Sequence, residues 1–159
     1  MPELQTQYRL LMNVSSFAQR KTLPHQVPSW VGQGARHFVT INARDRAAAP
    51  FAAPAVAGVL LENLRAYETL GQWHIWIAVI MPDHLHFIAT FNLDDAIHMT
   101  VAAWKRYQAR TLKIHFQRDY FEHRLRNEDE FVEKMTYIRE NPVRKQLVKS
   151  SADYPYIIG

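Results

Sequence analysis

The chain has 159 residues with 8 histidines, no cysteine and a formal net charge of +4. Its length suits one domain, and a composition of 48% hydrophobic and 21% charged residues excludes wholesale disorder. The absence of cysteine excludes a disulfide scaffold, a thiol nucleophile and a thiolate metal site. Any bound metal would therefore use histidine, carboxylate, amide or water ligands.

The predicted elements begin after an irregular N-terminal arm at residues 1–35, which has room for a short helix over 4–13. Alternating aromatic and β-branched residues predict strands over 36–43, 72–81, 84–91 and 120–125. Helical spacing of apolar residues predicts helices over 55–70, 94–115 and 128–141, with Asn127 capping the last helix and Pro142 ending it. Residues 146–159 are expected to form a C-terminal tail, so the main domain spans residues 36–145.

The order β-α-β-β-α-β, followed by a third helix, is typical of an α+β ferredoxin-like (RRM-like) fold. Such a fold has an antiparallel sheet with two helices on one face. Its other face is then free to carry a site or the C-terminal helix.

The positive charge is concentrated in the last third of the chain. Residues 1–100 carry 7 Lys and Arg against 7 Asp and Glu, whereas residues 101–149 carry 12 against 7. Such clustering is expected of a phosphate-binding surface. A solvated helix face rich in lysine and arginine explains it equally well.

His84 and His86 are two residues apart in a predicted strand, so their imidazoles point to the same side of the sheet. Leu85 and Phe87 point to the other, apolar side. We expect the imidazoles on the face that the helices leave uncovered, where they could serve as metal ligands. Two histidines do not define a metal geometry, and ordinary hydrogen bonding also explains the pair, so a third ligand is required.

Tyr137 and Asn141 are four residues apart and so share one side of the last predicted helix. That side is predicted to be the polar one, opposite the apolar stripe of Phe131, Met135 and Ile138. Asn141 would stand at the very end of the helix, because Pro142 disfavours helical geometry in the residue before it. An amphipathic surface tyrosine and a C-terminal asparagine are the plain alternative interpretation.

Two segments resemble the signatures of REP-associated tyrosine transposases, which belong to the HUH superfamily of single-tyrosine, single-strand DNA nucleases. They are VIMPDHLHFIATF (79–91) and YIRENPVRKQLV (137–148). Further similarity in KTLPHQVPSWVGQGARHFVTINARDR (21–46), WKRYQARTL (104–112) and FQRDYFEHRLRNEDEF (116–131) extends the resemblance over residues 20–156. Phe116 stands where the family usually has Trp, and Asp83 where Asn is frequent. Neither departure is expected to touch the chemistry.

The resemblance implies a metal-dependent single-stranded DNA endonuclease and strand transferase. Tyr137 would attack a DNA phosphodiester, giving a covalent 5′-phosphotyrosine and a free 3′-hydroxyl. A divalent ion, Mg²⁺ or Mn²⁺, would be held by His84, His86 and, by analogy with the family, Asn141, and would act as a Lewis acid. The implied substrates are DNA hairpins formed by repeated extragenic palindromes, with short flanking single strands.

Phosphate contacts are expected from the basic last third of the chain, which would make DNA affinity fall with salt. The candidates lie on the long helix, on the fourth strand and around the last helix: Lys105, Arg106, Arg110, Arg124, Arg126, Arg139, Arg144 and Lys145. In the arm, Lys21, His25 and Trp30 are candidates for base contacts, and packing explains them as well.

Two other functions compete with this one. A catalytically silent nucleic-acid-binding protein on the same fold would keep the basic surface and lose the reaction. A histidine-metal hydrolase of small phosphoesters would need an acidic group beside the histidines, and Asp83 is the local candidate.

Several properties follow less directly from the sequence. The apolar stretches fall far short of the ~20 residues that a membrane helix needs, and no targeting signal is evident. We therefore expect a cytoplasmic, nucleoid-associated protein without membrane contacts. Monomer and homodimer stay open, and in a dimer that exchanged its last helices Tyr137 would act on the histidines of the second copy.

Overall fold

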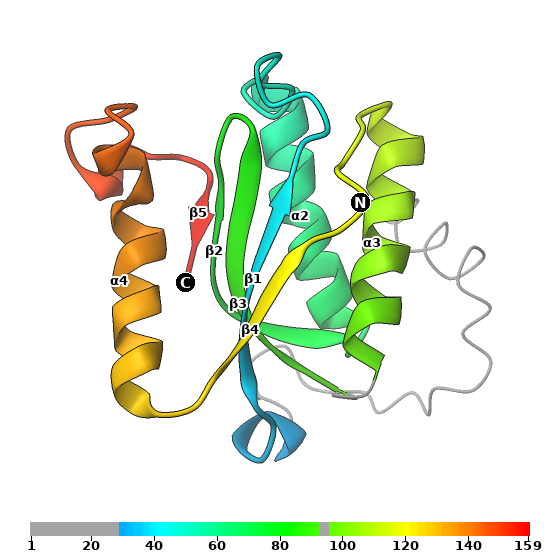
Figure 1. The fold of residues 1–159 in the computed structure, drawn as a ribbon, viewed down its shortest axis with the longest axis vertical. Helices are drawn as coiled ribbons and strands as arrows, with labels where there is room; N and C mark the ends of the chain where they lie inside the picture. Colours follow the sequence, from blue (N-terminus) through cyan, green and yellow to red (C-terminus); the bar gives the residue numbers. More distant parts are fainter. Residues whose placement is uncertain (1–28, 93–95) are drawn as a thin grey trace.

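The structure, a computed structural model, describes residues 29–92 and 96–159. Five antiparallel strands form one sheet in the order β4-β1-β3-β2-β5 (Figure 1). The strands are β1 (Arg36–Asn42), β2 (Trp73–Ile80), β3 (His84–Phe91), β4 (Phe121–Leu125) and β5 (Ile157–Ile158). The helices are α2 (Pro54–Thr69), α3 (Ile97–Leu112) and α4 (Glu128–Arg144), with 3₁₀ turns η1 (Ser29–Gly32) and η3 (Ser151–Asp153).

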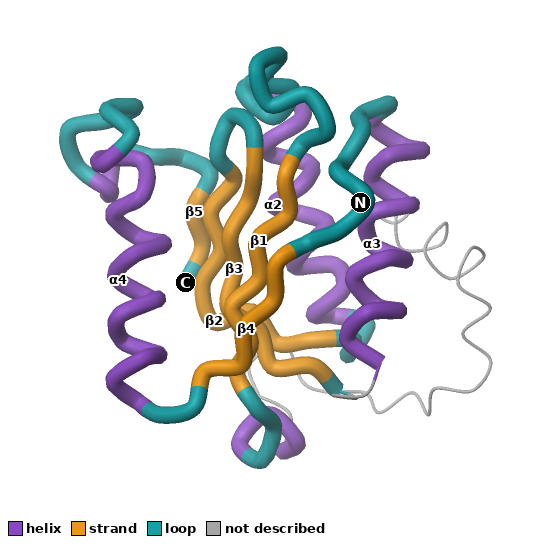
Figure 2. Tube along the Cα trace, viewed as in Figure 1, coloured by secondary structure: helices purple, strands orange, loops and turns teal. Residues whose placement is uncertain are grey.

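Three layers result, because α2 and α3 lie on one side of the sheet and α4 on the other (Figure 2). The order β1-α2-β2-β3-α3-β4 with α4 following confirms the expected ferredoxin-like α+β fold. The strand predicted at residues 84–91 matches β3 at both ends. The helix predicted at 94–115 is shorter in the structure, since α3 spans Ile97–Leu112, and residues 94 and 95 lie outside the described residues. The helix considered for residues 4–13 also lies outside them.

The larger core lies between the sheet and the helices α2 and α3. Leu85, Phe87 and Ala89 of β3 point into it, as their alternation with the histidines predicts, and pack with Trp73 and Trp104. Each of the large apolar side chains buried here contributes roughly 1.5–3 kcal/mol relative to an exposed one. The opposite side of β3, which carries His84 and His86, therefore faces α4.

A smaller core lies between the sheet and α4. The pairing of β2 with β3 shifts register between Ile75 and Ile77, so the alternation of β2 is broken there. As a result Trp76 and Ile77 both belong to the α4 side, and Trp76 donates from Nε1 to Thr90 Oγ1 at 3.0 Å. Phe131 and Ile138 of α4 pack onto this surface. Strand β2 thus contributes side chains to both cores.

Helix α4 begins as predicted and ends later than predicted. Asn127 is the N-cap, and its side chain accepts a hydrogen bond from the Glu130 amide at 2.9 Å. The helix was expected to end at Asn141, but it continues to Arg144 with Pro142 inside it. Proline is tolerated because it removes only one donor, within the final turn. The Lys145 amide still donates to the Asn141 carbonyl at 3.0 Å.

The residues expected to form a tail instead complete the sheet. Ile157 and Ile158 pair with Val79 and Ala78 of β2, so the end of the chain is a fifth strand at that edge. Tyr154 donates its hydroxyl to the Ile80 carbonyl at 2.7 Å. Within the described part of the chain, no helix has the length and apolar character to cross a bilayer.

Candidate functional site

His84 and His86 lie side by side on the middle strand of the sheet. Their ring centres are 4.6 Å apart, and each residue is only 6% exposed. They share one side of β3, as predicted, but that side is not open, because α4 packs over it. The expectation of a face uncovered by helices is therefore wrong for this region, and the pair sits in a partly desolvated site between the sheet and α4.

Both histidines have a fixed hydrogen-bond partner at Nδ1. The Nδ1 of His84 lies 2.6 Å from Asp83 Oδ1, and the Nδ1 of His86 lies 2.8 Å from Thr40 Oγ1 on the neighbouring strand β1. Asp83, which was expected not to touch the chemistry, thus contacts one of the two candidate metal ligands. With Nδ1 occupied, Nε2 is the nitrogen that each ring has left to offer a ligand.

The environment keeps both rings uncharged. Burial, together with the neighbouring His84, lowers the pKa of His86 to about 3. Burial also lowers the pKa of His84, against the opposing hydrogen bond and charge of Asp83. Neutral imidazoles have the lone pair that metal coordination requires.

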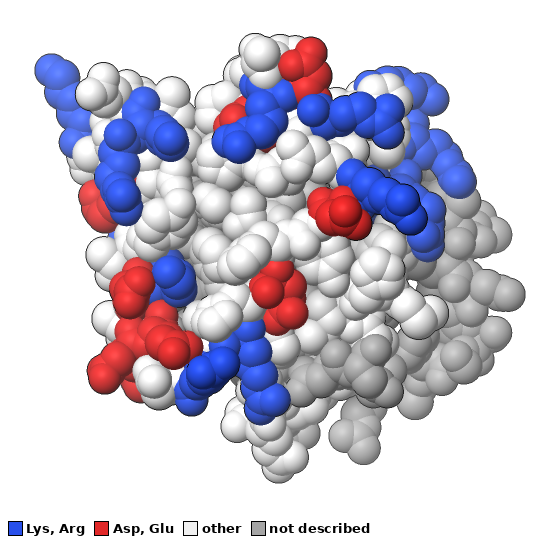
Figure 3. All heavy atoms as spheres, in the orientation of Figure 1, with Lys and Arg blue, Asp and Glu red and all other residues white. Residues whose placement is uncertain are grey.

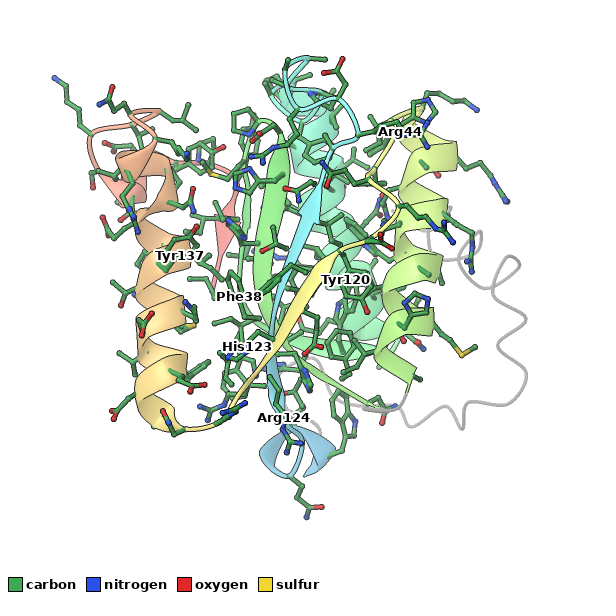
Figure 4. The ribbon with its side chains drawn as sticks, in the orientation of Figure 1. Phe38, Arg44, Tyr120, His123, Arg124 and Tyr137 are labelled. Carbon is green, nitrogen blue, oxygen red and sulfur yellow. The ribbon has the colours of Figure 1, made fainter. Side chains whose placement is uncertain are left out.

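Tyr137 reaches this pair from α4. Its ring centre is 5.4 Å from that of His86 and 6.1 Å from that of Phe38, toward which it points in Figure 4. The prediction that Tyr137 lies opposite the apolar stripe is wrong: the ring is half-buried beside Phe131 and Ile138, because the sheet-facing side of α4 is wide enough to include it.

Two cations flank the Tyr137 ring. Lys134 Nζ lies 5.7 Å and the Arg144 guanidinium 5.3 Å from the ring centre. They come from positions three residues before it and seven after it, which lie on the same side of a helix. An anionic group approaching the phenol would meet positive charge along α4.

Asn141 is one turn further along the same side of α4. Asn141 therefore shares the side of the helix that carries Tyr137, whose ring contacts His86. It is 3% exposed, and its Oδ1 has no hydrogen-bond partner within the described residues. A buried acceptor left unsatisfied costs about 1–3 kcal/mol. Such an oxygen is free to accept a hydrogen bond or to bind a cation.

The residues at this point fit a divalent metal ion. Two imidazole nitrogens and an amide oxygen form a donor set suited to Mn²⁺ or Mg²⁺. No group of three or more His, Cys, Asp and Glu residues that could hold a metal exists in the described ranges. A third protein ligand would have to be of another residue type, and the buried amide oxygen of Asn141 is a candidate.

Similarity to known proteins is found at the level of the fold. No protein-family model matches the sequence, and no curated protein matches it. A solved REP-associated tyrosine transposase bound to a REP hairpin matches with a TM-score of 0.69 and 22% identity, over 87% of this chain and 82% of that one. The chain has the fold of that transposase. A presumed transposase from Deinococcus radiodurans R1 matches with a TM-score of 0.48 and 15% identity, over 77% of this chain and 97% of that one.

The basic candidates are spread over the fold. On the face seen in Figure 3, lysines and arginines gather toward the edges, and residues without charge occupy most of the middle. Arg144 and Lys145 lie at the C-terminal end of α4, near the tyrosine and the histidines. Arg139 is exposed and, two residues from Tyr137, lies on the far side of the helix.

Arg124 and Arg126 lie elsewhere, at an open pocket of about 550 Å³ where β4 leads into α4. Arg126 lies just beyond the end of β4, so the two arginines do not share the strand as predicted.

The candidates for phosphate contacts on α3 lie apart from Tyr137 and the histidines. Lys105, Arg106 and Arg110 belong to the helix layer on the opposite side of the sheet from Tyr137 (Figure 2). Lys105 Nζ also donates to the Gln117 and Arg118 carbonyls, both at 2.8 Å, so it stabilises the segment before β4. Arg106 and Arg110 are exposed.

Only one of the three arm candidates can be placed. Lys21 and His25 lie outside the described residues, and Trp30 lies half-buried in η1. The Trp30 carbonyl accepts from the Gln33 and Gly34 amides at 3.2 and 2.9 Å, which closes that turn.

Sequence reasoning missed several residues of the site. Thr40 and Phe38 alternate on the side of β1 that faces the histidines, so pairing β1 with β3 would have found them. Phe38 stacks on His86 with ring centres 5.4 Å apart. Arg46, which donates from Nε to Asp83 Oδ2 at 2.7 Å, had no signal in the sequence.

Proposed function

We propose that this protein is a metal-dependent single-stranded DNA endonuclease and strand transferase of the REP-associated tyrosine transposase type, acting through Tyr137. One observation carries the proposal: the phenol ring contacts His86 on the same side of α4 as Asn141, whose buried Oδ1 is unpartnered within the described residues. The shared fold with a transposase solved on a REP hairpin supports it. Hairpin-forming repeat DNA is the proposed substrate.

The proposed reaction forms one bond and breaks one. The Tyr137 hydroxyl oxygen gives up its proton to solvent and bonds to phosphorus, while the bond from phosphorus to the 3′ oxygen breaks. The 3′ oxygen takes up a proton and leaves as a hydroxyl, and the 5′ phosphate remains on Tyr137. A 3′-hydroxyl from another strand reverses the step, so strand transfer needs no nucleotide cofactor.

The chain's own residues supply position and charge for this reaction. His84, His86 and Asn141 would hold a divalent ion, which when bound supplies Lewis-acid polarisation of the phosphate. Lys134 and Arg144 flank the phenol and would neutralise the phosphate as it arrives. Arg106, Arg110, Arg124, Arg126, Arg139 and Lys145 stay candidates for phosphate contacts further along the DNA.

A denaturing gel tests the proposal. A hairpin with a labelled single-stranded flank is incubated with the protein and Mn²⁺, and we expect a covalent protein–DNA adduct. The adduct should be lost in Tyr137→Phe and His84→Ala and retained in Tyr120→Phe, which alters a tyrosine just before β4 whose ring stacks on His98 of α3. Hairpin binding without an adduct under any divalent metal would contradict the proposal and support a catalytically silent DNA-binding protein.

A further inference from the structure

The β2–β3 turn places a carboxylate directly behind the first histidine. The two carboxylate oxygens of Asp83 have different partners: Oδ1 lies 2.6 Å from His84 Nδ1, and Oδ2 accepts a hydrogen bond from Arg46 Nε at 2.7 Å. Resting on the proposed function, we propose that Asp83 is a positioning residue for the metal site, which acts through His84 and is itself held by Arg46.

The backbone around Asp83 is fixed by neighbouring segments. Its carbonyl accepts from the Ala43 amide, and the Pro82 carbonyl accepts from the Phe51 amide, both at 2.9 Å. The Met81 amide donates to the His84 carbonyl at 2.8 Å and closes the turn. These contacts tie the turn to the loop between β1 and α2, which also carries Arg46. The position of the Asp83 carboxylate is therefore determined by hydrogen bonds of both its backbone and its side chain.

This arrangement selects one form of His84. An ionised carboxylate only accepts hydrogen bonds, so the proton of neutral His84 must be on Nδ1 and the lone pair on Nε2. The negative charge behind the ring also makes Nε2 a stronger donor to a metal. His86 lacks such a constraint, because the Thr40 hydroxyl at 2.8 Å can either donate or accept. His84 is thus the ligand whose form is dictated by a charged partner.

Arg46 completes the arrangement. It occupies the second oxygen of Asp83, so the carboxylate is kept from rotating toward the metal position and is partly neutralised. The result is a chain of contacts from an exposed arginine through a carboxylate to an imidazole, in which each partner fixes the orientation of the next.

Two measurements on the metal-free chain and its Mn²⁺ complex, both without DNA, test the proposal. Nitrogen NMR shifts of the imidazoles should show wild-type His84 protonated at Nδ1, and Asp83→Ala should lose this preference. Mn²⁺ affinity, measured by electron paramagnetic resonance, should fall about 10–100-fold in Asp83→Ala. Asp83→Asn should keep the Nδ1–H form and most of the affinity, since the amide oxygen still accepts. Asp119→Ala, an exposed carboxylate before β4, should change neither measurement.

The outcomes separate this inference from the proposed function. A folded Asp83→Ala with unchanged His84 protonation and unchanged Mn²⁺ affinity would overturn the inference. If Asp83→Ala does not fold, Asp83→Asn decides: loss of the Nδ1–H form with wild-type affinity also overturns it. Failure of the wild-type chain to bind Mn²⁺ would overturn the metal site of the proposed function, and the His84 NMR signal would still report whether Asp83 sets the imidazole.

Discussion

The ring of Tyr137 meets the ring of His86 at 66°, with the two centres 5.4 Å apart. One residue belongs to α4 and the other to β3, and both are in the same copy of the chain. The proposed nucleophile and one proposed metal ligand of the same chain therefore lie in contact. On the proposed function, this contact predicts catalysis in cis.

Mixing two inactive variants checks this arrangement. Tyr137→Phe and His84→Ala each lack one half of the proposed site, and because the halves belong to one chain, a mixture should form no more adduct than either variant alone. The readout is the covalent adduct on a labelled hairpin, with a mixture of wild type and Tyr137→Phe as the positive control. Recovery of adduct in the mixture of inactive variants would instead indicate exchanged helices in a dimer.

Asn141→Leu should separate metal binding from folding. Leucine has the same branching and the same number of side-chain heavy atoms as asparagine, and it removes a buried oxygen that lacks a partner in the described structure, so the free energy of unfolding of the metal-free protein should not fall. Mn²⁺ affinity should fall at least ~10-fold, because an amide ligand is removed. Urea denaturation in EDTA and Mn²⁺ titration give the two values. A destabilised variant with intact affinity would mean that Asn141 serves the fold alone.

Salt dependence should distinguish Arg144 from Lys105. Arg144→Gln should reduce the slope of log K against log salt by ~0.7–0.9, the value expected when one fewer phosphate is neutralised. Lys105→Met should leave that slope unchanged and lower the free energy of unfolding by ~1–3 kcal/mol, since two carbonyls lose their donor. Hairpin binding by anisotropy at several salt concentrations measures the slopes. A changed slope in Lys105→Met would place DNA on the α3 side.

Tyr154 provides a prediction about pH. Burial, with the neighbouring Tyr156, raises the pKa of Tyr154 to about 12 in the folded protein, above the ordinary value of 10.0. The folded state thus holds the phenolic proton more tightly, so the hydroxyl contributes fully below pH 10 and loses its contribution as the pH rises toward 12. Tyr154→Phe should cost about 1 kcal/mol at neutral pH, because the Ile80 carbonyl loses its donor.

Thermal or urea unfolding between pH 7 and pH 11 checks whether the contribution of Tyr154 to stability falls as the pH rises. The stability gap between wild type and Tyr154→Phe should be constant up to about pH 10 and shrink above it. Tyr120→Phe serves as the control at neutral pH only: its hydroxyl is not bonded to the β2 backbone in any described contact, but burial also raises the pKa of Tyr120. A gap that widens with pH would mean that the Tyr154 proton is not held by the fold.

The elements that could be predicted from sequence are those whose polar and apolar residues repeat at a regular interval. The alternation of His84, Leu85, His86 and Phe87 fixed both the strand and its two faces, because each half of the pattern has a distinct polarity. The spacing of Tyr137 and Asn141 correctly placed them together on one side of α4. These features depend only on residues close in sequence.

Features that depend on distant partners could not be predicted in this way. The pattern did not indicate the bulge at Trp76, because the register shift is a property of how β2 pairs with β3. The final strand is only two residues long and pairs with β2 from 78 positions away in the chain, between Val79 and Ile157. The Asp83 contacts needed knowledge of where Arg46 lies, which only the folded chain provides.

The last helix is anchored at both ends. At its start, Glu128 pairs with Arg36 at 2.7 Å, and the Arg36 guanidinium lies 3.9 Å from the Phe131 ring centre. At its far end, the chain turns back and joins β2 as β5. On the proposed function, a DNA end attached to Tyr137 would therefore be held beside the histidines until a 3′-hydroxyl arrives, so the released strand has the first chance to rejoin it.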